Sequence, residues 1–242
     1  MTMTTPARRH QARVRAEKAA AAAAAPGESL AGASHYELML AKLLVDIRRL
    51  HALQSVARKI EVKREVLPEY ADYVSGALKG GRGAQDEVLT TVMIWRIDAG
   101  DYVGALEIAR YALQHGLSLP ARYERSTAAV LAEQFADAAL TALRDGGTFD
   151  ADQLNEVREL TEGTDMHDQI RAKLNKALGL AFMKAIADES LDDLTDYGRA
   201  RAALQCLETA LKLDARAGVK QNINRLQTQV VDADCRRLAA RT

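Results

Sequence analysis

The side chains that could do chemistry in this sequence are first of all a group of cations near its start. The first 25 residues hold five of them, with Glu17 as the only acid, and they are Arg8, Arg9, Arg13, Arg15 and Lys18. Arginine and lysine neutralise phosphates and release the counterions around a nucleic acid, and this binding needs no folded pocket. The segment therefore predicts a DNA-binding arm. A solvated arm on a neutral protein is the alternative interpretation.

A second group of cations lies between residues 48 and 64, beside an apolar stripe that predicts a helix. Its members are Arg48, Arg49, Arg58, Lys59, Lys63 and Arg64. One interpretation is a solvated helix face. The other is a basic flank that lies on DNA and contributes to salt-dependent binding. Together with the arm, these residues make up the DNA-binding set that the sequence predicts.

A possible nuclease motif occurs in the same region, because Glu61-Val62-Lys63 has the Glu-x-Lys form and Asp46 precedes it. Nucleases with this motif place their acids on neighbouring strands that converge on a metal ion. Here the residues fall along one expected helix, where Asp46 and Glu61 would be about 22 Å apart at a rise of about 1.5 Å per residue. We therefore expect no catalytic residue in this set. A metal-dependent endonuclease remains the enzyme alternative.

Other cofactor and metal signatures are incomplete. The glycine-rich segment 80–83 is followed by Ala84 and Gln85 instead of the Lys-Ser or Lys-Thr of a phosphate-binding loop. None of the five histidines has a partner four residues away, and neither Cys206 nor Cys235 has a ligand neighbour. The acidic cluster within 188–196 lacks the spacing and central glycine of a calcium loop. We therefore expect no cofactor and no metal, and interpret the cluster as a solvated loop or a docking surface for a basic partner.

The composition fits a globular protein with a real hydrophobic core. The 242 residues carry no formal net charge, but residues 1–65 hold 12 basic and 6 acidic side chains, whereas residues 148–198 hold 5 and 12. With 5% aromatic residues, 15 glycines and four prolines, the chain offers few turns and β-formers for a sandwich or barrel. Two cysteines exclude a disulfide scaffold, and no apolar run reaches membrane-spanning length. The start of the sequence lacks the apolar block of a signal peptide, although its Arg- and Ala-rich composition resembles a transit peptide.

An amphipathic helix is predicted from Ser34 to about Val66. Ser34 and Glu37 form a capping-box pattern at its start. Apolar residues at alternating spacings of four and three then form a stripe, which is diluted further on at Gln54 and Ala57. The stripe consists of Tyr36, Leu40, Leu43, Ile47 and Leu50. We expect it to pack between subunits, as an oligomerisation surface, or within its own domain.

The rest of the sequence is predicted to form helices separated by turns. Residues 85–99 and 103–115 form a helix pair with small residues typical of a tetratricopeptide-like hairpin. Further helices are expected at 126–144, 152–162, 166–187, 197–213 and 217–238, and no stretch alternates convincingly with period two. We therefore predict an all-α protein in four parts, which are a disordered basic arm (1–33), the amphipathic helix (34–66), a central helical domain (67–145) and C-terminal helical hairpins (146–242).

Five stretches of the sequence carry a resemblance to a known family. The longest lies within Gly83–Leu113 and includes Thr91-Val92-Met93-Ile94-Trp95-Arg96. The others are Thr5–His10, Tyr36–Leu43, Arg171–Leu174 and Leu213–Lys220. In these stretches the chain resembles the terminase small subunits of P2-like tailed phages, the type traditionally called the endonuclease subunit. It departs from that family in lacking a Lys- and Pro-rich C-terminal tail, and it has no clear helix-turn-helix signature.

The resemblance implies a subunit that acts in the host cytoplasm and recognises the cohesive-end region of concatemeric phage DNA during genome packaging. It also implies a homo-oligomer, commonly a ring, that presents DNA to a large subunit carrying the ATPase motor. The family's name implies endonuclease activity, but the sequence holds no nuclease site to which that role could be carried over. We therefore expect the cut to belong to the large subunit. A helical-repeat scaffold that does not bind DNA is the remaining alternative.

Overall fold

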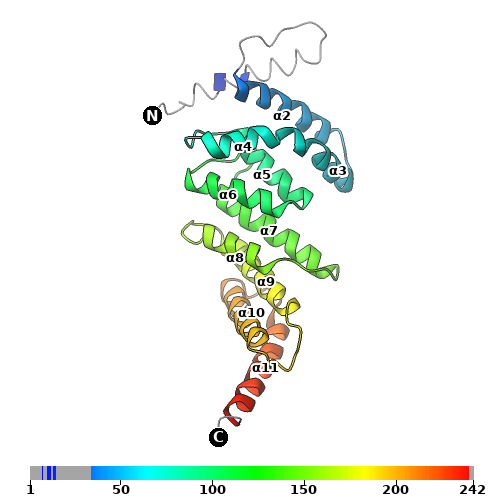
Figure 1. Cartoon of the computed structure of the whole chain (residues 1–242), viewed down its shortest axis with the longest axis vertical. Coiled ribbons are helices and arrows are strands. Elements are labelled where there is room, and N and C mark those ends of the chain that lie inside the picture. Colours follow the sequence, from blue (N-terminus) through cyan, green and yellow to red (C-terminus); the bar gives the residue numbers. More distant parts are fainter. Residues whose placement is uncertain (1–6, 8–9, 12, 15–33, 240–242) are drawn as a thin grey trace. The chain divides into compact units, whose positions relative to one another are not determined.

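The computed structural model describes residues 7, 10, 11, 13, 14 and 34–239, and every regular element among them is a helix (Figure 1). This confirms the all-α prediction. None of the helices in these ranges has the length and hydropathy needed to span a membrane. Two compact units, Met1–Thr127 and Ala128–Thr242, divide the chain. The predicted boundaries after residues 33, 66 and 145 stay predictions.

The first unit is built around one buried helix. Its described elements are α2 (His35–His51), α3 (Val56–Val66), the short 3-10 helix η1 (Leu67–Tyr70), α4 (Ala71–Gly80), α5 (Glu87–Ala99) and α6 (Tyr102–Gln114). Every side chain of α5 from Val88 to Trp95 is buried. A helix that is apolar on all sides must be surrounded by other elements, and α2, α3, η1 and α6 all pack on α5.

The amphipathic helix predicted up to Val66 is interrupted, and this part of the prediction was wrong. It begins as expected, because the Ser34 hydroxyl accepts from the Glu37 N–H at 3.2 Å and the Glu37 carboxylate accepts from the Ser34 N–H at 2.9 Å. It ends at His51, and α3 starts after Ser55, whose hydroxyl accepts from the Arg58 N–H at 3.3 Å. The cap at Ser55 gives the second helix its own start at the point where the apolar stripe is diluted.

The predicted helix pair around residues 98–101 is confirmed as α5 and α6. Gly100 ends α5 with a positive φ of 85°, which costs glycine little. Asp101 then caps α6 by accepting a hydrogen bond from the Gly104 N–H at 3.0 Å. A Cβ atom at Gly104 would overlap the guanidinium at the far end of the Arg96 side chain, so glycine leaves room for that side chain in its observed position. The tetratricopeptide-like character of this pair stays a prediction.

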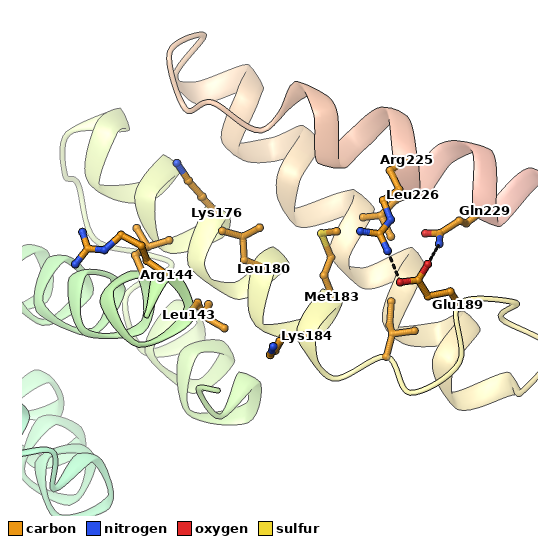
Figure 2. Close-up of a pocket in the computed structure, with 12 residues that line it drawn as sticks. Leu143, Arg144, Lys176, Leu180, Met183, Lys184, Glu189, Arg225, Leu226 and Gln229 are labelled. Atoms are coloured by element: carbon orange, nitrogen blue, oxygen red, sulfur yellow. Dashed lines mark hydrogen bonds and ion pairs between the residues drawn. The ribbon is translucent and has the colours of Figure 1, made fainter. Parts of the chain in front are cut away.

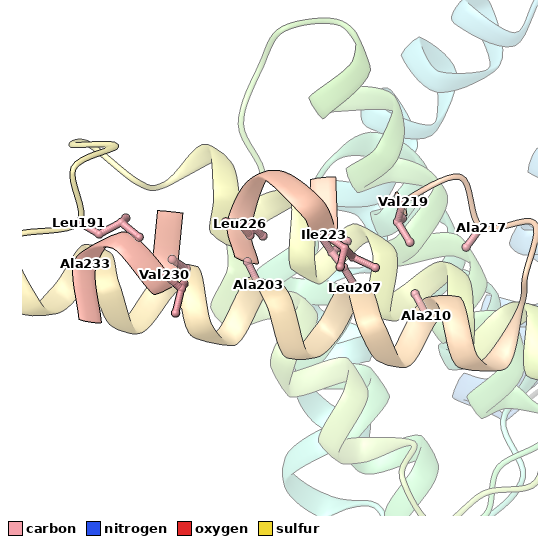
Figure 3. Packing of buried hydrophobic residues seen from close by; sticks show 11 residues of the cluster. Leu191, Ala203, Leu207, Ala210, Ala217, Val219, Ile223, Leu226, Val230 and Ala233 are labelled. Carbon is pink, nitrogen blue, oxygen red and sulfur yellow. The ribbon is translucent and has the colours of Figure 1, made fainter. Parts of the chain in front are cut away.

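The second unit has its own core between long helices. Its helices are α7 (Thr127–Arg144, with Thr127 assigned to the first unit), α8 (Ala151–Leu160), α9 (Asp168–Lys184), α10 (Leu194–Leu213) and α11 (Lys220–Ala239). Helix α10 packs against both α9 and α11. Leu207 of α10 lies in one apolar cluster with Leu226 and Val230 of α11 (Figure 3). This cluster confirms the predicted C-terminal hairpin.

The acidic segment 188–196 is bonded largely to its own unit. The Asp196 carboxylate accepts hydrogen bonds from the backbone N–H groups of Asp188 at 3.0 Å and Ala187 at 3.2 Å. These bonds, with the Arg199 guanidinium, hold the pKa of Asp196 below its ordinary value. Asp193 caps α10 by accepting from the Thr195 N–H at 2.8 Å. The segment therefore caps the start of α10 and links it to the loop that follows α9. Because several of its carboxylates already have partners, fewer of them are available to an external partner than in a fully solvated loop.

Replacing Leu207 by alanine should lower the free energy of unfolding by about 2–5 kcal/mol, because a fully buried leucine leaves a cavity when it is truncated. Leu194→Ala is the matched control on the same helix, since its side chain is 75% exposed. The control should change the free energy by less than about 0.5 kcal/mol. Urea unfolding followed by circular dichroism measures both. Equal transition midpoints for the two variants would show that Leu207 does not hold the core.

Candidate nucleic-acid interface

Basic side chains from three separate segments of the first unit, two of them carrying lysine or arginine, meet around a cavity of about 200 Å³. The end of α2 contributes His51, α3 contributes Lys59 and Lys63, and the loop after α6 contributes Arg122. Apolar and aromatic side chains complete the lining, and they are Ile47, Leu50, Trp95 and Tyr123. A pocket with several cations beside aromatic rings is suited to a phosphate group and the sugar or base attached to it. We name it the basic cavity.

Arg122 is held in place by a buried threonine. Its Nη2 atom donates to the Thr91 hydroxyl at 3.2 Å, and its guanidinium carbon lies 5.1 Å from the centre of the Tyr123 ring. The Tyr123 N–H in turn donates to the Pro120 carbonyl at 2.9 Å, which closes a turn in the loop. Because an arginine fork pairs well with phosphate oxygens, a guanidinium fixed in this way is prepared for an anion.

The two lysines of the cavity differ in whether their ammonium groups already have a carboxylate partner. The Lys63 ammonium lies 2.5 Å from a carboxylate oxygen of Asp98, and both side chains are half-buried or more. The Lys59 ammonium makes no hydrogen bond or ion pair with any residue that the structure describes. Lys59 and Arg122 are therefore the cations that can turn to a bound phosphate without losing a carboxylate partner.

The other predicted cations of this region lie on its exposed surface and have partners. Arg49 forms a two-pronged ion pair with Glu65, with nitrogen–oxygen distances of 3.2 and 2.8 Å. Arg58 pairs with Glu61 at 2.7 Å, and Arg64 donates to the Ala99 carbonyl at 3.1 Å. Arg48 donates to the Leu44 carbonyl at 3.3 Å. Exposed pairs of this kind contribute about 1 kcal/mol or less, so a phosphate can compete for these side chains.

Only part of the predicted arm can be placed. Arg8, Arg9, Arg15 and Lys18 lie outside the described residues. Arg13 is described, and its guanidinium lies 3.8 Å from a carboxylate oxygen of Glu87, at the start of α5. The role of the arm in DNA binding stays a prediction.

The predicted oligomerisation stripe packs inside the chain. Leu40 and Leu43 are each 2% exposed and Leu50 is 6% exposed, while Tyr36 and Ile47 are partly buried. Packing within its own domain was one of the two expectations for this stripe. Contact of these residues with a second copy stays a prediction.

Comparison with known proteins places the chain in a family. The model of the phage small terminase subunit family matches residues 40–169. The chain is 45% identical over 228 residues, 94% of its length and 86% of the relative, to "Terminase, endonuclease subunit" of Escherichia phage P2. The chain belongs to the phage small terminase subunit family. It is also 22% identical over 192 residues, 78% of its length and 68% of the relative, to "Probable terminase, endonuclease subunit" of Haemophilus phage HP1 (strain HP1c1). No solved structure matches this chain.

The possible nuclease residues of this small terminase subunit have three different sets of partners. Asp46 is buried, where it accepts hydrogen bonds from the Tyr70 hydroxyl at 2.6 Å and the Lys42 ammonium at 2.8 Å. Glu61 pairs with Arg58, and Lys63 is the lysine bound by Asp98. Among the described residues, no group of three or more His, Cys, Asp or Glu side chains could hold a metal ion. The three residues do not converge on one point.

The sequence prediction found only part of the basic cavity. Lys59 and Lys63 belong to the predicted DNA-binding set, whereas His51, Arg122 and Tyr123 do not. A cation next to an aromatic residue at 122–123 is a weak local signal for phosphate or base binding. Residues 122–123 and α3 come together because both contact α5. No periodicity in the sequence predicts that packing.

Asp46→Ala should lower the free energy of unfolding by about 1–3 kcal/mol, because it leaves the buried Tyr70 hydroxyl without an acceptor. Burial is the largest cause that raises the pKa of Tyr70, and it remains in the variant, so the phenol stays protonated there. Glu61→Gln is the control, since it removes an exposed ion pair worth about 1 kcal/mol or less. Urea unfolding measures both changes.

The control variant of this experiment also tests the nuclease motif. Glu61→Gln should leave DNA cutting by the assembled terminase within a few-fold of the wild-type rate. Metal-dependent cutting that disappears in a folded Glu61→Gln protein would contradict the structural interpretation of this motif.

Proposed function

We propose that this small terminase subunit binds the cohesive-end packaging site of phage DNA, assembles into a ring and presents the DNA to the large subunit. The observation that carries the DNA-binding part is the basic cavity, where Lys59 and Arg122 project from different segments beside an aromatic ring. Membership of the family supports the packaging role. The charge distribution supports a local contact, because the chain as a whole carries no net charge.

In this proposal the basic cavity takes a backbone phosphate. The Arg122 fork and the Lys59 ammonium neutralise its oxygens, while Tyr123 packs against the adjoining sugar or base. The contact fixes how the duplex lies on the protein, but a phosphate carries no sequence information. Sequence discrimination has to come from other side chains close to the cavity.

The first turn of α3 is the proposed element for reading bases. Val56 is 70% exposed, and Ala57 and Arg58 beside it are also exposed. In helix–turn–helix proteins the N-terminal residues of the second helix contact base edges in the major groove. Helix α3 follows α2 after a short turn and starts beside the basic cavity, so a phosphate bound there would bring a groove close to this turn. The arm, with Arg8, Arg9, Arg15 and Lys18, would add phosphate or minor-groove contacts.

The printed names of the relatives favour a second candidate, in which this chain is itself a metal-dependent endonuclease. We propose instead that cutting belongs to the large subunit, because Asp46, Glu61 and Lys63 are engaged with separate partners. The purified chain, incubated with magnesium and cognate DNA in the absence of the large subunit, separates the two. Specific cutting under these conditions would establish the second candidate.

The double variant Lys59→Ala, Arg122→Ala should weaken DNA binding and flatten its salt dependence. Each phosphate that the protein no longer neutralises reduces the slope of log affinity against log salt by about 0.9, so loss of the single phosphate held in the basic cavity should reduce the slope by about 0.9 per engaged subunit. Fluorescence anisotropy with cognate and scrambled duplexes at several salt concentrations measures this slope.

A matched control is Lys212→Ala, an exposed lysine of α10 in the other unit. It should leave affinity and slope unchanged. A double variant that is folded, by circular dichroism, and binds with the wild-type slope would remove the basic cavity from the interface. Wild-type protein that is not retained on DNA at moderate salt would instead favour the scaffold alternative.

Deletion of residues 1–25 tests the arm separately. Folding should be preserved, because the deleted segment has no cluster of bulky apolar side chains. If all five cations of the arm contact phosphates, the salt slope should fall by about 4.5 per engaged subunit. Fluorescence anisotropy over the same salt range measures this change too. An unchanged slope would assign the salt-dependent binding to residues 26–242 alone.

A further inference from the structure

The second unit contains an apolar groove with a basic rim. The groove has a volume of about 800 Å³ and lies between α7, α9, the segment after α9 and α11 (Figure 2). Leu143, Leu180, Met183 and Leu226 form much of its floor. Its lining runs along α9 from residue 176 to 184, which corresponds to about 12 Å at a rise of 1.5 Å per residue. A groove of this length accommodates two turns of a helix, and the flexible Met183 lets it adapt.

The rim of the groove has one cation without a partner among the described residues. Arg225 is paired with Glu189, and the Lys176 ammonium donates to the Ala217 carbonyl at 2.6 Å. Lys184 is exposed and forms no hydrogen bond or ion pair with the described part of the chain. A segment that fills the groove should therefore have apolar side chains on one face and a carboxylate near Lys184.

The same chain carries such a segment near its end. On the last turns of α11, Val231 is 58% exposed, Cys235 is exposed and Leu238 is 65% exposed. The spacing is i, i+4 and i+7, so the three side chains form one stripe about 10.5 Å long. Helices that bind in apolar grooves use anchors with this spacing. We call it the α11 stripe.

The charges next to the α11 stripe complement the rim of the groove. Asp232 is exposed and has no hydrogen-bond or ion-pair partner among residues 34–239. The neighbouring cations are turned back onto their own unit, because Arg236 pairs with Asp192 at 3.2 Å and Arg237 donates to the Leu191 carbonyl at 2.6 Å. Within the described residues, the unpaired charge of the stripe is thus negative, and the unpaired charge of the rim is positive.

A chain cannot place this stripe in its own groove. Leu226 of α11 faces the groove, and at 100° per residue the stripe residues lie about 120–180° around the helix from it. Because α11 is already one wall of the groove, its opposite face points away from it. The groove and the stripe can be joined only when they belong to different molecules.

We propose that the α11 stripe of one copy of this chain docks in the groove of a second copy. The contact joins two different surfaces, so each copy keeps one free groove and one free stripe. Interfaces of this head-to-tail kind form rings when the rotation between copies closes, and filaments when it does not. This contact rests on the self-assembly proposed above, and it specifies the surfaces that take part. It does not depend on the proposed DNA binding.

Two variants that each destroy one side of the contact test this proposal. Val231→Asp with Leu238→Asp places charges on the stripe, and Leu143→Glu with Lys184→Glu does so in the groove. Each variant alone should lose the wild-type assembly in native mass spectrometry and appear as the 26.4 kDa chain. An equimolar mixture should form a species of twice that mass and nothing larger, because one intact groove and one intact stripe remain.

Val103→Asp is the matched control, since this valine is 63% exposed in the first unit. It should keep the wild-type mass. Stripe variants that also keep that mass, or a mixture of folded variants that stays monomeric, would overturn the inference while leaving the proposed assembly intact. A wild-type chain that is monomeric at the same concentration would overturn both. An assembly lost in the control as well would show that the effect is not specific to the stripe, and would likewise overturn the inference.

Cross-linking tests the contact without charged substitutions. Cys235 belongs to the stripe and Cys206 is buried, so Lys184→Cys places a second accessible thiol at the rim of the groove. Mild oxidation should then join successive copies into a ladder of disulfide-linked multimers on a non-reducing gel. The ladder should vanish when Cys235→Ser is added. A ladder that persists without Cys235, or a variant that assembles but does not cross-link through it, would contradict docking of the stripe in the groove.

Discussion

Helix α5 is the constraint on which the candidate nucleic-acid interface depends. Its side chains are buried around the whole circumference from Val88 to Trp95, so its few polar groups must find partners close by. Thr91 binds Arg122 at 3.2 Å, and Asp98 binds Lys63 at 2.5 Å. Residues 91 and 98 are seven apart and lie on one face of the helix, two turns from each other. One face of a buried helix thus positions cations from two segments that are distant in sequence.

The turn between α2 and α3 makes this arrangement possible. In one continuous helix, His51 and Lys59 would be about 12 Å apart along the axis. The cap at Ser55 starts a second helix, and residues of α2 and α3 then line the same cavity. The sequence predicted the start of α2 from Ser34 and Glu37, because a capping box is a local pattern. It did not predict the turn, because the stripe keeps its spacing through Gln54 and Ala57 and a serine cap without an acidic third residue is a weaker signal.

The same contrast between local and distant interactions explains what could be predicted in the rest of the molecule. The α5–α6 pair and the hairpin of α10 and α11 follow from short turn signals and helical periodicity, and both are present. The acidic break at residues 188–193 was placed between helices correctly, although α10 begins at Leu194 and not at Tyr197, and the partners of the break could not be predicted. Arg225 and Arg236, which bind Glu189 and Asp192, lie 36 and 44 residues further along the chain. Such pairs depend on the packing of α11, which only the folded unit defines.

The charge of the chain limits how DNA binding can work. With no net charge overall, the protein has little long-range attraction for a polyanion, and the basic cavity would provide only one phosphate site in each copy. Weak sites become effective when several of them are linked, because each further contact is then made at a high effective concentration. A contact between copies that uses only residues of the second unit requires none of the residues of the basic cavity, which belong to the first unit. Assembly through α11 and DNA recognition through α3 therefore use different residues of the chain. By linking several weak DNA sites, the proposed assembly would supply the affinity that one copy of α3 lacks.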